Sequence, residues 1–268
     1  MKPFLKAVAL DLDGTLLSSK GEIHSTALSS IEELSDRGCV VIVATARPLR
    51  RVKELLPHSF RNHYWATCNG AWICRHGSIL ARTEIPAATA LELATRLAGY
   101  GLKVRIEAND TFYIDRLLQP RSDGSARPLQ AYQEFDACKI LAWVDSSAQI
   151  ELISESLDDQ LSMVVTDGDQ LVQIARKDCS KLNAVQAVLS MEGLGLQDLI
   201  AFGDDNNDVA LLRAAGCGVA MANSTAGVLE VADYVTKSND QDGVGQVLRA
   251  ILKGEPVGDS TISLSRLG

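Results

Sequence analysis

Short apolar runs alternate with amphipathic segments at both ends of the chain. Five runs rich in β-branched, aromatic or small apolar residues predict buried strands: Ala7–Leu10, Val40–Ala44, Tyr64–Thr67, Leu199–Phe202 and Gly218–Met221. Apolar residues at helical spacing predict helices between them, over 25–37, 182–191 and 208–215. Ser25 is the expected N-cap of the first helix, and Gly38, Gly193 and Gly216 are expected to end the three. Alternating strands and helices predict a doubly wound, Rossmann-like parallel sheet.

The middle of the chain changes to a pattern of hairpins. Pairs of short extended segments flank three turn sequences: His76-Gly77, Asn109-Asp110 and Asp167-Gly168-Asp169. Further elements are predicted as helices over 88–98 and 148–157 and a strand over 139–144, while residues 119–128 are expected to be a loop. Because hairpins imply antiparallel pairing, we expect residues 84–176 to form an inserted α+β cap domain. Residues 1–83 and 177–268 would then form the α/β core, with a loose tail after Gly254.

Composition narrows the class of protein. The chain has 268 residues, 46% of them hydrophobic, and a net charge of −8, so an acidic surface argues against a nucleic-acid partner. No apolar run approaches the roughly 18 residues of a membrane span, and the first residues lack a signal-peptide layout. We therefore expect a cytoplasmic protein, with six scattered cysteines that are reduced and buried. Whether it is a monomer or a small homo-oligomer is left open.

Two acidic clusters each follow an apolar strand. In Asp11-Leu12-Asp13-Gly14-Thr15, the two carboxylates point the same way from extended backbone at a strand's C-terminal end, where open α/β sheets bind ligands. Gly203-Asp204-Asp205-Asn206-Asn207-Asp208 gathers more oxygen ligands, which suit Mg²⁺. The alternative is a pair of solvated turns, and Asp208 alone could be a helix N-cap. Taken jointly, the clusters favour a metal site.

Two positions are candidates for holding phosphate. Thr45-Ala46-Arg47 follows a strand, so the Thr hydroxyl and backbone N–H groups could bind phosphate oxygens. Taken alone, Thr45 is better explained as a helix N-cap, with Pro48 in the first turn. Lys181 lies in the first turn of a helix capped by Ser180, where a positive charge opposes the helix dipole. A bound anion would explain this placement, and a surface lysine is an equal alternative.

Together these motifs resemble the haloacid dehalogenase superfamily. Its four signatures occur in order: the Asp11 motif, Thr45, Lys181 and the Asp204 motif. The spacing is similar to the Cof-type sugar-phosphatase branch, whose large cap lies between the second and third signatures. Local matches to that branch include Asn69-Gly70-Ala71, 215–223, 232–236 and 242–244. Two positions depart from the branch, which usually has glycine where this chain has Ala46 and Leu182.

The resemblance implies a Mg²⁺-dependent phosphoric monoester hydrolase acting on a small phosphorylated metabolite. Asp11 would be the nucleophile and form an aspartyl-phosphate, and Asp13 would be the general acid and base. The Mg²⁺ ligands would be Asp11, the backbone carbonyl of Asp13 and Asp204, with Asp208 orienting metal-bound water. Phosphate would be held by Thr45, Ala46, Lys181 and Asn207, and Arg47 would lie near the leaving group. Substrate choice would lie in the cap, where five residues could contact the substrate, although each is better explained as a cap surface or core residue: Tyr113, Arg116, Arg121, Arg127 and Trp143.

Two other functions remain open at this point. A phosphomutase of the same superfamily would return the phosphate to a bound sugar, and only its product distinguishes it. A catalytically silent metabolite-binding protein could share the fold, although the presence of Asp11, Asp13, Lys181 and Asp204 argues against it. An acid at position 13 favours an alcohol leaving group that needs a proton, and so a phosphatase or mutase over a dehalogenase.

Overall fold

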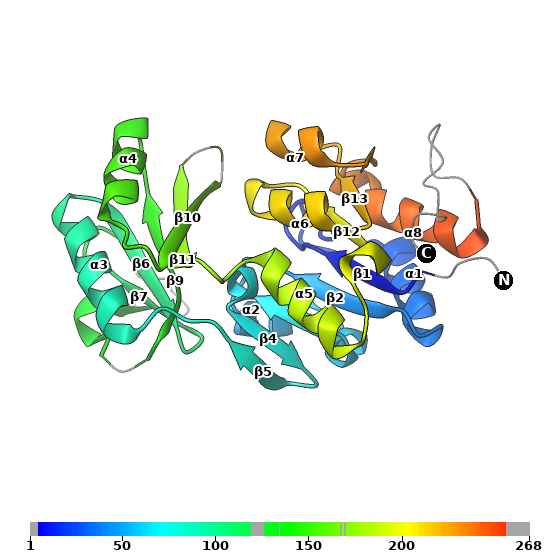
Figure 1. The fold of residues 1–268 in the computed structure, drawn as a ribbon, viewed down its shortest axis with the longest axis horizontal. Helices are drawn as coiled ribbons and strands as arrows, with labels where there is room; N and C mark the ends of the chain where they lie inside the picture. Colours follow the sequence, from blue (N-terminus) through cyan, green and yellow to red (C-terminus); the bar gives the residue numbers. More distant parts are fainter. Residues whose placement is uncertain (1–4, 119–125, 134, 167, 169, 256–268) are drawn as a thin grey trace.

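The computed structural model describes residues 5–118, 126–133, 135–166, 168 and 170–255 (Figure 1). Two sheets form the frame of the molecule, one in each of the two lobes that Figure 1 shows side by side. Among the described residues, no helix is both long and apolar enough to cross a membrane.

The larger sheet has eight strands in the order β14-β13-β12-β1-β2-β3-β4-β5. Their bounds are β1 (Ala7–Leu10), β2 (Val40–Ala44), β3 (Tyr64–Thr67), β4 (Trp72–Arg75), β5 (Ser78–Arg82), β12 (Leu199–Gly203), β13 (Cys217–Ala220) and β14 (Tyr234–Val235). The pairs from β14 to β3 are parallel, whereas β3, β4 and β5 pair antiparallel. The predicted doubly wound α/β fold is therefore confirmed, with the expected hairpin at one edge.

Helices cover both faces of this sheet. They are α1 (Ser25–Asp36), α2 (Leu49–Leu55), α5 (Lys181–Met191), α6 (Val209–Ala214), α7 (Ala226–Val231) and α8 (Gly243–Lys253). In β1, Val8 and Leu10 pack in one hydrophobic cluster with α1, α2 and α8, while Ala7 and Ala9 pack in the other with α5, α6 and α7. Strand residues thus alternate between two buried faces, which is why these strands appear as continuous apolar runs in the sequence.

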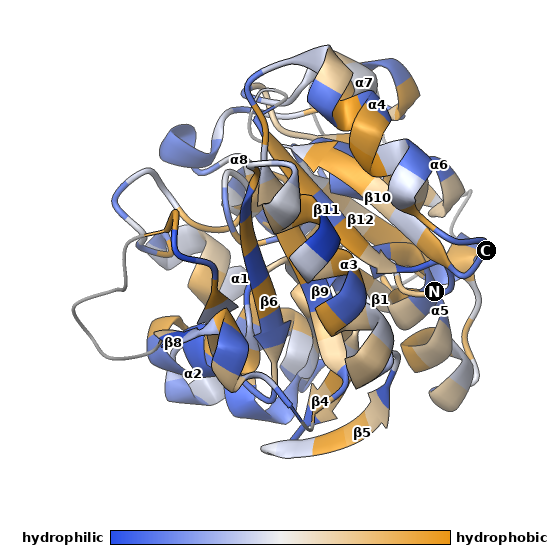
Figure 2. Ribbon diagram, turned by 90° about the vertical axis from the view of Figure 1, so that its left-hand side faces the viewer, coloured by the Kyte–Doolittle hydropathy of each residue, from blue (hydrophilic) through white to orange (hydrophobic). Residues whose placement is uncertain are grey.

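The second sheet has six strands in the order β10-β11-β9-β6-β7-β8. Its elements are α3 (Ala87–Gly99), β6 (Lys103–Ala108), β7 (Thr111–Ile114), β8 (Ala126–Pro128), β9 (Ala137–Trp143), α4 (Ser147–Ser156), β10 (Leu161–Thr166) and β11 (Leu171–Arg176). Apart from the parallel β7–β8 pair, its neighbours are antiparallel. Both Asn109 and Asp110 adopt positive φ, as a two-residue hairpin turn requires. In the view coloured by hydropathy, β10 is largely orange, as is β12 of the core sheet (Figure 2).

Among the described residues, helices cover one face of this second sheet and leave the other open. Val104 and Ile106 of β6 and Ile140 of β9 pack in a cluster with residues of α3 and α4. The intervening residues of β6, β9 and β11 face the larger sheet and line a cavity against it. The second sheet is therefore a cap whose open face looks onto the core.

Several sequence-based expectations need correction. Ser25 is the first helical residue of α1, and His24 occupies the N-cap position without a side-chain hydrogen bond. Residues 126–128 of the expected loop form β8, and residues 119–125 lie outside the described part of the chain. Helix α6 ends at an extended Ala215, so Gly216 is not a left-handed stop. The expected tail lies outside the described residues beyond position 255.

Three expectations about small residues are met. Gly38 and Gly193 follow α1 and α5 with positive φ. Ser180 caps α5 by accepting a hydrogen bond of 3.0 Å from the backbone N–H of Asn183. All six cysteines lie within the described residues, are buried and form no disulfide.

Candidate active site

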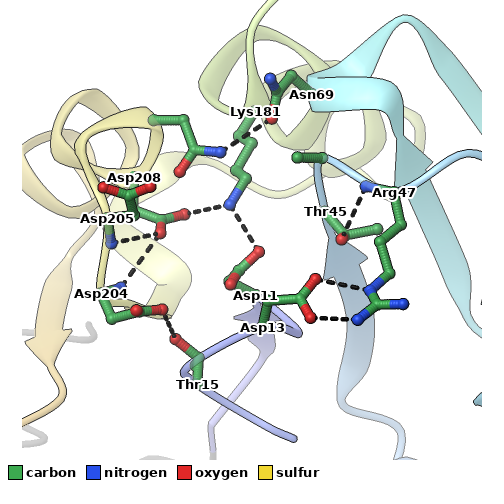
Figure 3. Close-up of polar contacts among 12 residues, drawn as sticks. Asp11, Asp13, Thr15, Thr45, Arg47, Asn69, Lys181, Asp204, Asp205 and Asp208 are labelled. Carbon is green, nitrogen blue, oxygen red and sulfur yellow. Dashed lines mark hydrogen bonds and ion pairs between the residues drawn. The ribbon is translucent and has the colours of Figure 1, made fainter. Parts of the chain in front are cut away.

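The predicted site residues come from the C-terminal ends of adjacent parallel strands. Asp11 follows β1, Thr45 follows β2 and Asp204 follows β12, and these strands are neighbours in the sheet. The backbone N–H of Asp11 donates to the carbonyl of Phe202 at 3.2 Å, which ties the two acidic segments together. Because parallel strands end at one edge, residues almost 200 positions apart in the chain meet there (Figure 3).

Lys181 joins two carboxylates inside the protein. Its Nζ lies 2.6 Å from Oδ1 of Asp11 and 2.7 Å from Oδ1 of Asp208. The lysine side chain is 1% exposed, so the surface alternative for this residue is excluded. Burial acts to lower the pKa of Lys181, but the charges of Asp11 and Asp208 outweigh it and hold the pKa above its usual value. The ammonium is therefore a fixed positive charge at the base of the site.

Three carboxylates crowd around one point. Ligand oxygens of Asp11, Asp204 and Asp208 all lie within 4.8 Å of one another. Burial, with the charges of Asp208 and Asp204, raises the pKa of Asp11 well above its usual value, against the effect of Lys181. Burial also raises the pKa of Asp204 to about 7. The group thus holds more negative charge than Lys181 alone compensates.

Backbone and side-chain contacts fix the directions of these carboxylates. Asp208 accepts hydrogen bonds from the backbone N–H groups of Asp204 at 3.1 Å and Asp205 at 3.3 Å. Thr15 donates to Asp204 at 2.7 Å. Gly14 has φ +75°, and a side chain there would meet Asp204 Oδ2 at 2.2 Å. Asp208 does not use its side chain to cap α6, so the alternative of a simple N-cap fails.

The donor set fits Mg²⁺. Buried carboxylate oxygens are the hard ligands that this ion prefers, and their excess negative charge calls for a cation. The side chain of Asp13 is not part of this group, so a metal contact at this residue would have to use its backbone carbonyl, as the sequence suggested.

Asp13 instead contacts Arg47. The guanidinium Nε of Arg47 donates to Oδ2 of Asp13 at 2.6 Å, and its second nitrogen donates to Oδ1. This hydrogen bond raises the pKa of Arg47 above its usual value. Both residues line the same cavity as Asp11, so Asp11 and Asp13 do open onto one space.

Of the other phosphate candidates, Ala46 and Asn207 line this cavity, whereas Thr45 and Lys181 do not. Thr45 is fully buried, and its hydroxyl accepts a hydrogen bond of 3.1 Å from the backbone N–H of Arg47. It does not cap α2, whose N-cap is Pro48. Leu182, which with Ala46 departs from the family pattern, packs against the apolar cluster beneath α5.

The cavity has a volume of about 340 Å³ and lies between the rim of the core sheet and the open face of the cap. Core residues on its wall include Asp11, Asp13, Arg47 and Arg51. The cap residues on its wall are Arg105, Glu107, Phe112, Lys139, Leu141, Leu171 and Gln173. Except for Phe112, these are alternate residues of β6, β9 and β11.

Of the five cap contacts suggested from the sequence, four belong to the described part of the chain, and none of these four lines this cavity. Tyr113 is buried in the cap, where its ring packs edge-on against Tyr132 at 5.0 Å. Arg116 and Arg127 are exposed elsewhere, and Trp143 is stacked by Arg105. Arg121 lies outside the described residues.

Several residues of the site carried no local signal in the sequence. Lys139 is 4% exposed and donates to the backbone carbonyl of Ala46 at 2.7 Å. Gln173 of the cap accepts from both Lys139 and Asn69. Asn69 stood out only as part of a family match. The alternation of polar and apolar residues along β6 is a pattern that could have pointed to Arg105 and Glu107, but β9 and β11 show no such alternation.

Fold and site define a protein with an α/β core, an acidic site at one edge of its sheet and a cap over that site. A family model described as haloacid dehalogenase-like hydrolase matches residues 8–248, and the chain therefore belongs to this family, in its Cof-type branch. The prediction of a phosphoric monoester hydrolase is confirmed as to class.

Three similar proteins illustrate the range of relatives. The chain is 27% identical over 266 residues to the 5-amino-6-(5-phospho-D-ribitylamino)uracil phosphatase YitU of Bacillus subtilis, covering 92% of this chain and 97% of the relative. It is 26% identical over 231 residues to the HMP-PP phosphatase of Yersinia pseudotuberculosis, covering 82% and 84%. The solved structure of the subclass IIB sugar phosphatase BT4131 has a TM-score of 0.78 at 21% identity, covering 91% and 98%.

Proposed function

We propose that the chain is a Mg²⁺-dependent phosphatase that hydrolyses a small phosphorylated metabolite through an aspartyl-phosphate on Asp11. The observation that carries this proposal is the position of Asp11, which opens onto the cavity and is held from behind by Lys181. Asp204 and Asp208 lie within 4.8 Å of it but do not line the cavity. Asp11 is therefore the carboxylate of this group that a substrate can reach.

The residues support a two-step transfer. An oxygen of Asp11 attacks phosphorus, forming a P–O bond to the aspartate while the P–O bond to the leaving group breaks. Asp13 gives a proton to the departing oxygen and then takes one from the water that attacks the aspartyl-phosphate. Inorganic phosphate leaves and Asp11 is regenerated. Arg47 holds Asp13 at the cavity wall between these steps.

Positive charge around the phosphate comes from two sources in this proposal. Asn207 and the Ala46 backbone at the cavity wall, with Lys181 and Thr45 behind them, would hold the non-bridging oxygens. Asp11, Asp204 and the backbone carbonyl of Asp13 would hold Mg²⁺, with Asp208 behind them. When bound, this ion supplies charge that offsets the negative charge of Asp11 and the phosphate.

The cavity favours a small substrate. Its volume of about 340 Å³ lies at the low end of small-molecule sites. The relatives named as phosphatases of a ribitylaminouracil phosphate and of HMP-PP support a phosphorylated metabolite as substrate. Because the core side of the cavity is assigned to the phosphate and Mg²⁺, the residues on the cap side would recognise the leaving group.

A phosphorylated-metabolite panel tests this function. We expect release of free phosphate with Mg²⁺ and loss of activity with a chelator, and free phosphate would also exclude a pure mutase. Asp11→Asn should lower kcat at least about 10³-fold, because the nucleophile is removed. Asp36→Asn, at the exposed end of α1, is the control.

A covalent trap tests the assignment of the nucleophile. Beryllium fluoride should form an adduct on Asp11, detected by mass spectrometry, and Asp11→Asn should abolish it. Activity that survives chelation, or an adduct on another residue, would contradict the proposal.

A further inference from the structure

A continuous chain of hydrogen bonds crosses from the cap to the phosphate end of the site. Lys139 Nζ donates to Oε1 of Gln173 at 3.0 Å, and Asn69 Nδ2 donates to the same oxygen at 3.0 Å. Asn207 Nδ2 then donates to Oδ1 of Asn69 at 3.0 Å. Lys139, Gln173 and Asn69 are 4%, 7% and 8% exposed, so water competes little for these bonds.

Lys139, at the start of this series of hydrogen bonds, sets the donor-to-acceptor direction of the bonds that follow. An ammonium group can only donate, so Gln173 must turn its oxygen toward Lys139. Its amide nitrogen is occupied by a hydrogen bond to Oγ1 of Thr166 at 3.0 Å, which holds the same orientation. Asn69 can then approach Gln173 only with its NH₂ group, and its oxygen faces Asn207.

Asn207 is the last residue of this series of hydrogen bonds and belongs to the candidate active site. It lines the cavity next to Asp11 and directly precedes Asp208, the carboxylate bound to Lys181. One N–H of its amide is held by Asn69, so the carboxamide cannot rotate freely, and the other N–H remains for a ligand. Its Oδ1 is buried without a hydrogen-bond partner among the described residues.

We propose that Gln173 of the cap is a positioning residue for the phosphate end of the site, acting through Asn69 on the carboxamide of Asn207. This inference rests on the proposed phosphatase function and adds a role for a cap residue that is independent of the leaving group. Lys139 strengthens the link, because its ammonium also holds the carbonyl of Ala46 in the candidate phosphate loop at 2.7 Å. The cap is thereby connected to the phosphate end of the site at two points, Ala46 and Asn69.

A residue that positions the phosphate end and a residue that contacts the leaving group differ in how their loss depends on the substrate. If Gln173 acts on the phosphate end, Gln173→Met should lower kcat/KM by the same factor for phosphomonoesters with different leaving groups. The loss should be about tenfold or more, because misplacing a phosphate ligand affects every substrate equally. The inhibition constant of inorganic phosphate should rise as well. If Gln173 contacts the leaving group, the loss should vary between substrates and phosphate inhibition should stay the same.

A double-mutant cycle provides the second arm. In an Asn207→Ala background, Gln173→Met should have little further effect, because the group it positions is already missing. Gln173→Glu is the conservative variant, since a carboxylate can accept from both Lys139 and Asn69, and it should retain more phosphate affinity than Gln173→Met. This comparison also separates positioning from a general loss of cap stability, which thermal unfolding of both variants measures.

Phosphate binding separates the two proposals. Calorimetric titration of inorganic phosphate into the wild type and Gln173→Met, with Mg²⁺ present, requires no turnover. Weaker binding in the variant supports the positioning role even if no substrate is hydrolysed, in which case only the phosphatase proposal fails. Equal phosphate affinity in both proteins, a loss that depends on the leaving group, or additive effects in the cycle would overturn the role of Gln173.

Discussion

At the scale of single residues, the site is organised by one buried lysine. Lys181 holds Asp11 and Asp208 at hydrogen-bond distance in a place where an isolated charge would be costly. Asp204 adds a third carboxylate to the group, and burial raises its pKa to about 7. In the proposed function, the electrostatics of the site therefore depend on a balance between this ammonium and the Mg²⁺ that these carboxylates would hold.

Removing this ammonium is expected to affect stability as well as activity. In chelator at pH 8, Lys181→Met should lower the free energy of unfolding by about 3 kcal/mol, because buried carboxylates lose their partner. The loss should be smaller at pH 6, where the raised pKa values of Asp11 and Asp204 let these groups take up protons. Added Mg²⁺ should restore part of the difference.

Urea unfolding at both pH values, with and without Mg²⁺, measures these changes. Lys177→Met is the matched control, because Lys177 is exposed and its ammonium donates to a backbone carbonyl, that of Asp159, at 3.1 Å. A loss below about 1 kcal/mol at pH 8 would show that Lys181 is not the main partner of these carboxylates.

Single residues of the site differ in whether the sequence alone could predict them. Asp11 and Asp204 were predictable because each sits in a short acidic motif directly after a strand, and strand ends mark the rim of a parallel sheet. Lys139, Gln173 and Asn69 were not, because their partners lie 34 to 104 positions away. Nothing local in the sequence marks such a contact until the fold is known.

At the scale of elements, periodicity decided which parts of the fold were predictable. Strands buried on two faces were recognised as apolar runs, and the hairpins through their turn residues. The open face of the cap was missed, although alternate polar residues such as Arg105 and Glu107 mark it along β6. Helix α8 was missed because Gly243 and Gly245 have low helix propensity.

Packing explains these glycines. A side chain at Gly245 would meet the backbone nitrogen of Ala27 in α1 at 2.6 Å, and one at Gly243 would meet the carbonyl of Lys237 at 2.1 Å. The close approach of α1 at Gly245 and of Lys237 at Gly243 thus requires residues that weaken the start of α8. Asp242 compensates as the N-cap, with its side chain accepting from the backbone N–H of Gly245 at 3.2 Å.

Asp242, the N-cap of α8, is therefore expected to contribute more to the free energy of unfolding than an ordinary surface aspartate does. Asp242→Ala should lower the free energy of unfolding by about 1–2 kcal/mol, because it removes the cap and places alanine at φ +57°. Asp242→Asn keeps an acceptor and tolerates this backbone conformation, so it should lose less than half as much. Chemical denaturation of both variants checks this, and equal losses would argue against the capping role.

At the scale of the whole molecule, two lobes with separate hydrophobic cores meet across a polar interface. The cap has its own core, and the core domain has one on each face of its sheet. Between them lie hydrogen bonds such as those of Arg50 to the backbone carbonyl of Asp110 at 2.6 Å and Asn206 to that of Val165 at 2.9 Å. A polar interface of this kind is typical of domains that can move relative to each other. The chain of contacts through Gln173 makes the phosphate end of the site depend on this interface.

Global stability should also respond to pH through His63, in the core domain. This residue is 7% exposed and packs edge-on against Phe60 with ring centroids 5.3 Å apart. Burial, with the charge of Arg75, lowers the pKa of His63 from 6.5 to about 4. Between these two values the unfolded chain binds a proton that the folded chain does not, so the free energy of unfolding should fall as pH decreases from 6.5 to 4.

Comparison with a variant isolates this contribution from the carboxylates that titrate in the same range. The stability difference between wild type and His63→Gln should change by up to about 3 kcal/mol between pH 7 and 4, with the wild type losing more on acidification. His63→Phe should give the same pH dependence of the difference, because both replacements remove the titrating ring. Denaturant unfolding at pH 7, 6, 5 and 4 provides the curve. A constant difference across this range would mean that His63 is protonated as easily in the folded protein as in the unfolded chain, against the burial on which the prediction depends.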